Sequence, residues 1–329
     1  MNMRYAMLLL AVPLLLSTHT FGQSPQDEAA NFPTKPVQII VPFPPGGGSE
    51  AFARSIAVKL TQLWGQQVVI DNRGGAGGTI GSYLVVKAPP DGYTLLMGLN
   101  GTHGMAQSLY RKIPYDTMRD FTPITMVGIG PNILTVHPSV PVKSVKELIA
   151  LAKAKPGQLN YGSPGNGTPP HLQMEVFNKL ARVKMTHVPY KGGGPANVAL
   201  LSGEVQLAFT AVTVGLPYVE VGKLRALGLS GAKKPASLSR FPTVAESGLP
   251  GYDENTWYGI FGPAGLPPAI LNRLNADLVK VLSSPELKER FAQQGQEMVG
   301  NSPERFREIV RAEVAKWAEV IREIGLSLD

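Results

Sequence analysis

Three glycine-rich segments each follow a run of strand-forming residues and precede a helical stretch. They are Gly46–Ser49, Gly162–Pro170 and Lys191–Pro195. The N-terminus of a helix carries unpaired N–H donors and a partial positive charge, and glycine lets a ligand approach those donors closely. Three such segments predict a binding site for an anion, built from backbone groups rather than from charged side chains.

The first segment also comes close to two catalytic patterns. Gly46–Ala51 fits the dinucleotide pattern GxGxx(G/A), with Asp71 after the next strand, but two prolines before the first glycine lengthen a turn that must be tight. Gly47–Ala51 resembles the nucleophile elbow GxSxG of α/β hydrolases, but it ends in alanine. Because no base is paired with Ser49 in the local sequence, we favour binding and keep a secreted α/β hydrolase with Ser49 as nucleophile as the alternative.

Other residues that could carry chemistry are sparse. The chain has no cysteine, which excludes disulfides, thiolate metal sites and cysteine nucleophiles. Outside the N-terminal segment, histidines occur at 103, 137, 171 and 187, without HxxxH or HExxH spacing, so we predict neither a metal site nor a cofactor. His171 follows the second glycine segment, and its imidazole either binds a ligand or ties down its own loop.

Alternating strands and helices must position the three segments. Residues 37–41, 68–70 and 93–97 are rich in strand formers, and helices are expected from Glu50, with Ser49 as N-cap, and after Thr79. Further strands are expected at 124–136, 159–161, 186–190, 205–209 and 224–229, and helices after Ser144, Thr168 and Pro195. This order predicts an α/β fold of mainly parallel sheets flanked by helices, with a ligand crevice at the carboxyl ends of the strands.

The C-terminal part of the chain is helical and contains no predicted strand of its own. After residues 257–261 it carries leucines at helical spacing over 268–282, followed by two Ser-Pro helix starts. We expect this part to pack on the first α/β unit. The prediction is therefore two lobes, with lobe 1 formed by residues 32–132 plus 258–329 and lobe 2, residues 133–257, inserted in it, joined by two hinge crossovers.

The composition and the N-terminus indicate an exported protein. Its 31 basic and 24 acidic residues give a net charge of +7, but the longest basic run is Lys233-Lys234, so no nucleic-acid partner is expected. Arg4 precedes an apolar run from Tyr5 to Leu16, about 12 residues, which is too short to span a bilayer and is typical of a signal peptide. We predict a cleaved signal peptide over 1–22 and a periplasmic, monomeric protein.

Residues from about 33 to 325 resemble the periplasmic substrate-binding proteins of tripartite tricarboxylate transporters, also called the Bug family. The stretches that carry the resemblance are KPVQIIVPFPPGGGS at 35–49, DNR at 71–73 with GAGG at 75–78, PDGYTLL at 90–96, YGS at 161–163 with GNGTPPHL at 165–172, VPYKG at 188–192, GKLRAL at 222–227, FPTVAE at 241–246 and WYG at 257–259. The motifs occur in the family's order and span nearly the whole mature chain.

The resemblance implies a two-lobed, hinged binding protein of the type II-like class, which delivers a small carboxylate to a membrane transporter without catalysing a reaction. By position it implies ligand contacts from Phe43, Gly46, Gly47, Gly48, Ser49, Ser163, Gly165, Asn166, Gly167, Thr168, His171, Tyr190, Lys191, Gly192 and Thr210. Two positions depart from the family's pattern, because Glu50 and Thr210 each replace a common Asp. Without a carboxylate at 210, we expect a ligand that has no amine: a di- or tricarboxylate, or an aromatic carboxylate.

Overall fold

The computed structural model describes residues 29–328. These residues form one sheet of ten strands, in which eight follow the order β2-β1-β3-β9-β4-β7-β5-β6 and the other two, β8 and β10, pair with β4. Parallel pairs join β1 (Val37–Val41) to β2 (Val68–Asn72) and β3 (Thr94–Leu99), and join β5 (Asn160–Ser163) to β6 (Thr186–Pro189) and β7 (Leu207–Ala211). The predicted α/β class is confirmed, with parallel strands at both ends of this order.

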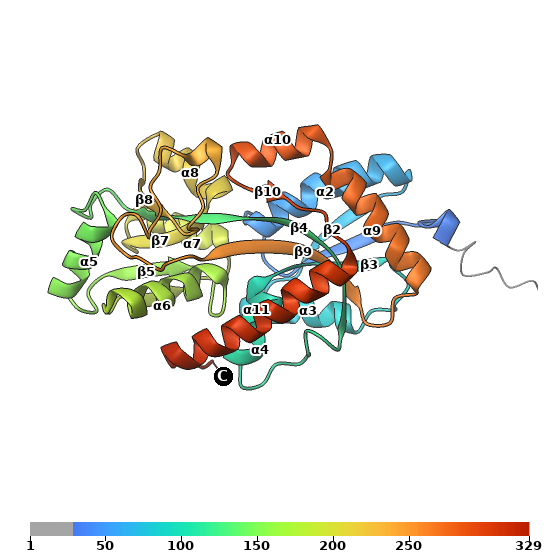
Figure 1. Ribbon diagram of the computed structural model, residues 1–329, viewed down its shortest axis with the longest axis horizontal. Helices are drawn as coiled ribbons and strands as arrows, with labels where there is room; N and C mark the ends of the chain where they lie inside the picture. Colours follow the sequence, from blue (N-terminus) through green and yellow to red (C-terminus); the bar gives the residue numbers. More distant parts are fainter. Residues whose placement is uncertain (1–28, 329) are drawn as a thin grey trace, which may run out of the picture.

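The centre of the sheet is antiparallel, so the sheet is mixed rather than mainly parallel. Its two long strands are β4 (Phe121–Val136) and β9 (Asn255–Pro263), and they pair antiparallel with each other. The short strands β8 (Arg225–Leu229) and β10 (Glu297–Met298) also pair antiparallel with β4. The prediction of mainly parallel sheets is wrong at the centre, because β4 and β9 carry the chain in opposite directions between the two halves of the molecule (Figure 1).

The helices flank the two halves of this sheet (Figure 1). They are α2 (Gly48–Trp64), η1 (Ala76–Gly78), α3 (Thr79–Val86), the π-helical η2 (Gly101–Met105), α4 (Ala106–Leu109), α5 (Val145–Ala154), α6 (Pro169–Ala181), α7 (Gly193–Ser202), α8 (Val212–Glu220), η3 (Ala236–Leu238), α9 (Pro268–Leu282), α10 (Pro285–Gln293) and α11 (Pro303–Ile324). We call the half with β1, β2 and β3 the larger half, and the half with β5, β6 and β7 the smaller half.

The helix starts follow the capping signals in most places. Ser144 caps α5, because its hydroxyl accepts a hydrogen bond of 3.1 Å from the N–H of Glu147. Thr168 precedes α6 as predicted. The prediction for α2 is wrong, because its N-cap is Gly47, where the chain is extended, and Ser49 lies inside the first turn.

Each half has its own buried cluster. In the larger half, Phe52 of α2 and Leu274 of α9 pack with the apolar residues of β1, β3 and β9. In the smaller half, Tyr161 and Phe177 pack with residues of α5 and β7. The last helix, α11, contacts both halves, since its Trp317 shares a cluster with α4 and α6. The two halves therefore meet along β4, β9 and α11, beside the candidate site.

Candidate functional site

A cavity of about 90 Å³ lies between the two halves, where the carboxyl ends of strands face the starts of helices. Its walls are Phe43, Pro44, Gly46, Gly47, Gly48, Ser49, Leu99, Asn132, Gly162, Ser163, Pro164, Thr168, Pro169, Pro170, Gly193, Ala196, Asn197, Ala208, Phe209, Thr210, Ala211, Val214, Thr256 and Tyr258. This position matches the expectation that ligands of open α/β sheets bind beyond the carboxyl ends of the strands.

Four helices begin at the cavity wall. Gly48, Pro169 and Gly193 are the first residues of α2, α6 and α7, and Ala211 is the N-cap of α8. Their N-terminal ends direct partial positive charge and unpaired N–H groups toward one place. The sequence analysis missed α8, because the turn between β7 and α8 contains no glycine. In α6 the two leading prolines lack an N–H, so this helix offers fewer donors than the others.

The described walls of the cavity include no Lys, Arg, His, Asp or Glu. Their polar side chains are Ser49, Asn132, Ser163, Thr168, Asn197, Thr210, Thr256 and Tyr258. Burial raises the pKa of the Tyr258 phenol well above its ordinary value, so its hydroxyl stays protonated. An anion in this cavity would therefore be stabilised by backbone dipoles and hydroxyl groups rather than by an ion pair.

The carboxylate of Glu50 supports the first glycine segment from outside the cavity. It accepts a hydrogen bond of 2.6 Å from the N–H of Gly46 and one of 2.7 Å from Arg54. The guanidinium of Arg54 also forms an ion pair of 2.6 Å with it. The first departure from the family's pattern thus orders the loop, and its negative charge is balanced by Arg54.

Eight of the fifteen residues expected at the site line the cavity: Phe43, Gly46, Gly47, Gly48, Ser49, Ser163, Thr168 and Thr210. They come from the first two glycine segments and from the end of β7. The other seven lie behind the walls, where they shape the loops. Direct contact of those seven with a ligand stays a prediction.

Three of the seven belong to the second glycine segment, and a fourth, His171, follows it directly. Gly165 and Gly167 have positive φ angles of 137° and 75°, which other residues rarely adopt. The carbonyl of Asn166 accepts a hydrogen bond of 3.0 Å from Tyr110 of the larger half. His171 ties down its own loop, because its Nδ1 accepts a hydrogen bond of 3.1 Å from the N–H of Gly167. Burial lowers the pKa of His171 to about 3, so this imidazole is neutral.

The remaining three belong to the third segment. The hydroxyl of Tyr190 donates a hydrogen bond of 2.7 Å to Glu204. The N–H of Gly192 donates one of 3.0 Å to Pro164, which joins the second and third segments. Lys191 is exposed to solvent. Gly193, which the sequence analysis did not select, lines the cavity instead.

The hydroxyl groups near the cavity do not form a catalytic arrangement. Ser49 has no hydrogen-bonded base among residues 29–328. The hydroxyl of Ser163 lies 2.6 Å from Nε2 of His187 and 3.0 Å from the carbonyl of Gly165. His187 stacks on His171, with ring centres 3.9 Å apart, and burial lowers its pKa to about 4. The described residues give His187 no carboxylate partner, so the hydrolase alternative is not supported.

Four polar wall residues were missed by the sequence analysis, and one of them is Asn197 of α7. Asn132 and Thr256 lie on the long strands β4 and β9, and Tyr258 follows on β9. The sequence offered a signal for Asn132, since it is a polar residue directly before the apolar Ile133-Leu134 in a predicted strand. In the structure only 3% of Asn132 is exposed. Tyr258 belongs to the stretch 257–259, which carried the resemblance but no assigned role.

The two halves touch across the cavity. The hydroxyl of Tyr110, in the larger half, hydrogen-bonds to Asn166 in the smaller half. Gly193 faces Gly47 so closely that a methyl group on it would lie 3.7 Å from the Cα atom of Gly47. These contacts hold the glycine segments of the two halves against each other and enclose the cavity.

Comparison with known proteins identifies the family. Residues 52–326 match the sequence model of the family described as tripartite tricarboxylate transporter family receptor. The chain belongs to this family. It is 36% identical over 310 residues to the protein BugT of Bordetella pertussis, covering 94% of this chain and 95% of BugT. The family receptors bind substrates, and the chain is not an enzyme.

Solved structures of the receptor family share the fold. Rpa4515 of R. palustris, solved with adipate, superposes with a TM-score of 0.87 at 38% identity, covering 90% of this chain and 99% of that one. MatC of Rhodopseudomonas palustris, solved with bound malate, gives a TM-score of 0.84 at 31% identity, covering 88% and 100%. These matches confirm the predicted class, an α/β periplasmic binding protein.

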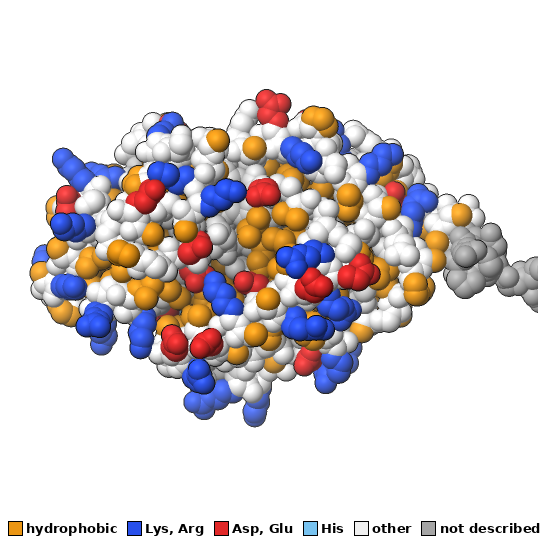
Figure 2. Space-filling view, in the orientation of Figure 1, with side chains coloured by type: hydrophobic (Ala, Val, Ile, Leu, Met, Phe, Trp, Pro, Cys, Tyr) orange, Lys and Arg blue, Asp and Glu red, His pale blue; other side chains and the backbone are white. Residues whose placement is uncertain are grey.

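Residues 29–328 contain neither a helix suited to span a membrane nor a cluster of side chains suited to hold a metal ion. None of the helices within 29–328 is both long and apolar enough to cross a membrane. The same residues contain no group of three or more acidic, histidine or cysteine side chains that could hold a metal ion. On the face seen in Figure 2, basic and acidic side chains are interspersed rather than gathered in one basic stripe.

Proposed function

We propose that this protein captures a small organic carboxylate in the periplasm and delivers it to the membrane subunits of a tripartite tricarboxylate transporter. The observation that carries the proposal is the convergence of four helix N-termini on a cavity whose described walls hold no charged side chain. Two structural relatives carry adipate and malate, both dicarboxylates. The ligand is a di- or tricarboxylate, or an aromatic carboxylate.

The proposal includes two lobes that close on the ligand. Lobe 1 consists of residues 32–132 plus 258–329, and lobe 2 of residues 133–257. The separate hydrophobic clusters of the two halves support this division, and β4 and β9 supply the two crossovers near 130 and 256. Small-angle scattering tests the motion: the curves with and without ligand should differ, and identical curves would contradict closure.

The ligand carries no amine. Thr210 offers only a hydroxyl, which donates a long hydrogen bond of 3.4 Å to the carbonyl of Ile133. An ammonium group in the cavity would have no carboxylate to pair with among the described walls, and an unpaired buried charge is costly.

The protein acts as an exported monomer. The expected signal peptide, residues 1–22, lies outside the described residues, so its cleavage rests on the sequence pattern alone. N-terminal sequencing of protein from the periplasmic fraction tests this part. A mature chain that begins near residue 23, eluting at monomer size, is the expected result.

A thermal-shift screen of the mature protein tests the function. The panel contains di- and tricarboxylates, aromatic carboxylates, and aspartate and glutamate as amine-bearing counterparts. Binding to the folded state raises Tm, and the amine-free acids should give the largest shifts. If the amino acids raise Tm most, the amine-free assignment is wrong, and if none of the acids raises Tm, the carboxylate function fails.

A further inference from the structure

Asn132 is the polar residue that β4 places in the wall of the cavity. Only 3% of Asn132 is exposed, so its side chain must find partners inside the protein. Its Nδ2 donates hydrogen bonds of 2.7 Å to Oε1 of Gln173 and 3.2 Å to Oγ1 of Thr256. Its backbone N–H donates to the hydroxyl of Ser230 at 2.8 Å. Two residues from the smaller half and one from β9 therefore hold it in place.

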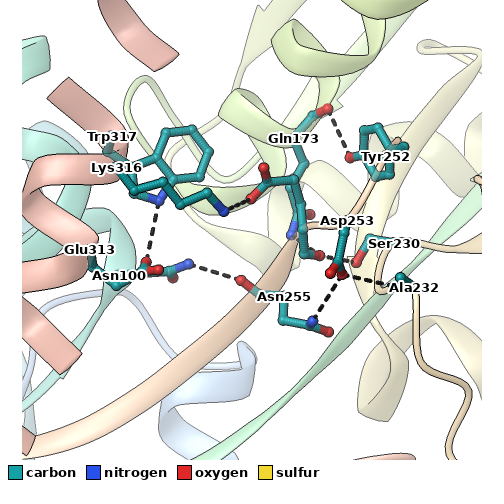
Figure 3. A network of polar contacts seen from close by, with 11 residues as sticks. Asn100, Gln173, Ser230, Ala232, Tyr252, Asp253, Asn255, Glu313, Lys316 and Trp317 are labelled. Atoms are coloured by element: carbon teal, nitrogen blue, oxygen red, sulfur yellow. Dashed lines mark hydrogen bonds and ion pairs between the residues drawn. The ribbon is translucent and has the colours of Figure 1, made fainter. Parts of the chain in front are cut away.

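The orientation of the Asn132 amide follows from its neighbours. Nε2 of Gln173 lies 3.2 Å from the carbonyl of Glu254, which can only accept a hydrogen bond. Gln173 therefore directs its side-chain oxygen toward Asn132, and the NH₂ group of Asn132 donates the hydrogen bond to it. The backbone of Gln173 is also anchored, because its main-chain carbonyl accepts a hydrogen bond of 2.9 Å from the hydroxyl of Tyr252 (Figure 3). The amide of Asn132 cannot flip without breaking this chain.

The side-chain oxygen Oδ1 of Asn132 accepts no hydrogen bond from the described residues. Both hydrogens of its NH₂ group are used, whereas Oδ1 has no hydrogen-bond partner within residues 29–328. Oδ1 is not among the fully buried polar atoms that lack a partner, so it is accessible at the surface of the residue. Asn132 lines the cavity, which supplies that accessible space. Oδ1 is thus an acceptor held at the cavity wall, and a ligand without a donor would leave it unpaired.

We propose that Asn132 is a specificity residue whose Oδ1 accepts a hydrogen bond from a hydroxyl group of the ligand. This inference rests on the proposed function and narrows it: the ligand is a hydroxy-carboxylate. The helix N-termini supply donors to the carboxylate oxygens, and a carboxylate has no hydrogen to give to Oδ1. A hydroxyl group supplies that hydrogen without bringing a charge into the uncharged walls.

Matched pairs of acids test the inference by calorimetry on the purified protein. The pairs are malate and succinate, 2-hydroxyglutarate and glutarate, and citrate and tricarballylate, which differ only by one hydroxyl group. In the pair whose chain length fits, the hydroxy acid should bind about tenfold more tightly or better, the effect of one buried hydrogen bond. Equal or tighter binding of the acid without the hydroxyl overturns the inference while leaving the carboxylate function intact. If none of the six acids binds, the inference fails, and the thermal-shift panel with its aromatic acids decides the carboxylate function separately.

A variant separates specificity from stability. Asn132→Leu should remove the preference for the hydroxy acid, so that the two members of the pair bind within about twofold of each other. Asn178→Leu is the matched control, because Asn178 is a buried residue of α6 that does not line the cavity. It should lower stability and leave the preference unchanged. An unchanged preference in Asn132→Leu overturns the role of Asn132, and if that variant does not fold, the matched pairs on the unmodified protein still decide.

Discussion

Glu254 lies just before β9, in a place where a carboxyl group is almost fully buried. Its side chain is 8% exposed, and its Oε2 lies 3.1 Å from the Nζ of Lys316 on α11. Burial raises the pKa of Glu254 to about 7 from its ordinary 4.5, and Lys316 offsets only part of that effect. The nearby charges of Glu313 and Asp253 raise it further. Ionised Glu254 should therefore cost stability, despite its ion pair.

The sign and the size of this cost follow from the two pKa values. Between pH 4.5 and 7 the folded protein keeps a proton on Glu254 that the unfolded chain has released. The stabilisation that this proton gives to the folded state is therefore fully present below pH 4.5 and is lost as the pH rises through 7. One pKa unit corresponds to about 1.4 kcal/mol, which makes the total about 3 kcal/mol. Glu254→Gln keeps the shape of the side chain and removes the titration. Relative to the unmodified protein, the variant should gain about 3 kcal/mol between pH 4 and pH 8.

Urea unfolding of both proteins across this pH range measures the difference in the free energy of unfolding. Burial lowers the pKa values of His103 and His171 in both proteins alike. Their effect on the free energy of unfolding is therefore the same in both and cancels in the difference. The control is Glu319→Gln, which removes a carboxylate that is 66% exposed on α11, the helix that carries Lys316, and it should change the free energy of unfolding only slightly. A flat difference for Glu254→Gln, or one that falls with rising pH, would refute the reasoning.

Two further predictions concern a glycine of the cavity wall, Gly48, and a glycine at the contact between the two halves, Gly77. Gly48→Ala should weaken ligand binding in calorimetry and also lower Tm, because the new methyl would lie 2.5 Å from the hydroxyl of the buried Tyr258 and the cavity wall would have to shift. Gly194→Ala, which adds the same methyl at an ordinary distance of 3.7 Å, should bind normally, and equal binding by both variants would contradict the prediction. Gly77→Ala should weaken binding at least about tenfold, because its methyl would overlap Asn166 of the other half and hold the cleft open. Scattering curves that match those of the unmodified protein would count against this second prediction.

Local elements could be predicted closely where the sequence carries a clear period. The strand 37–41 and the helix 268–282 have the bounds expected from their apolar pattern. Ser49 could not be placed, because the choice between Gly47 and Ser49 as N-cap depends on the carboxylate of Glu50 reaching back to Gly46. Capping propensity alone favours serine.

The candidate site was predicted in part. The first glycine segment lines the cavity as expected, because a strand that leads through glycines into a helix exposes its donors whatever the rest of the fold does. Tyr190 and His171 lie behind the walls, where each makes a hydrogen bond within the protein. The hydroxyl of Tyr190 donates to Glu204, and Nδ1 of His171 accepts from the N–H of Gly167. Such pairings join residues whose side chains meet only after the loops have folded.

The sequence by itself determined the α/β class, most of the helices and strands, and the backbone chemistry suited to an anion. Those properties depend on residue periodicity and on the conformational freedom of glycine, which act within a few residues. Only the tertiary structure decided that four helix N-termini meet, that β4 and β9 run antiparallel through the centre, and that Asn132, bonded to Gln173, joins the cavity wall. These facts depend on contacts such as the one between Asn132 and Gln173, which no local pattern encodes.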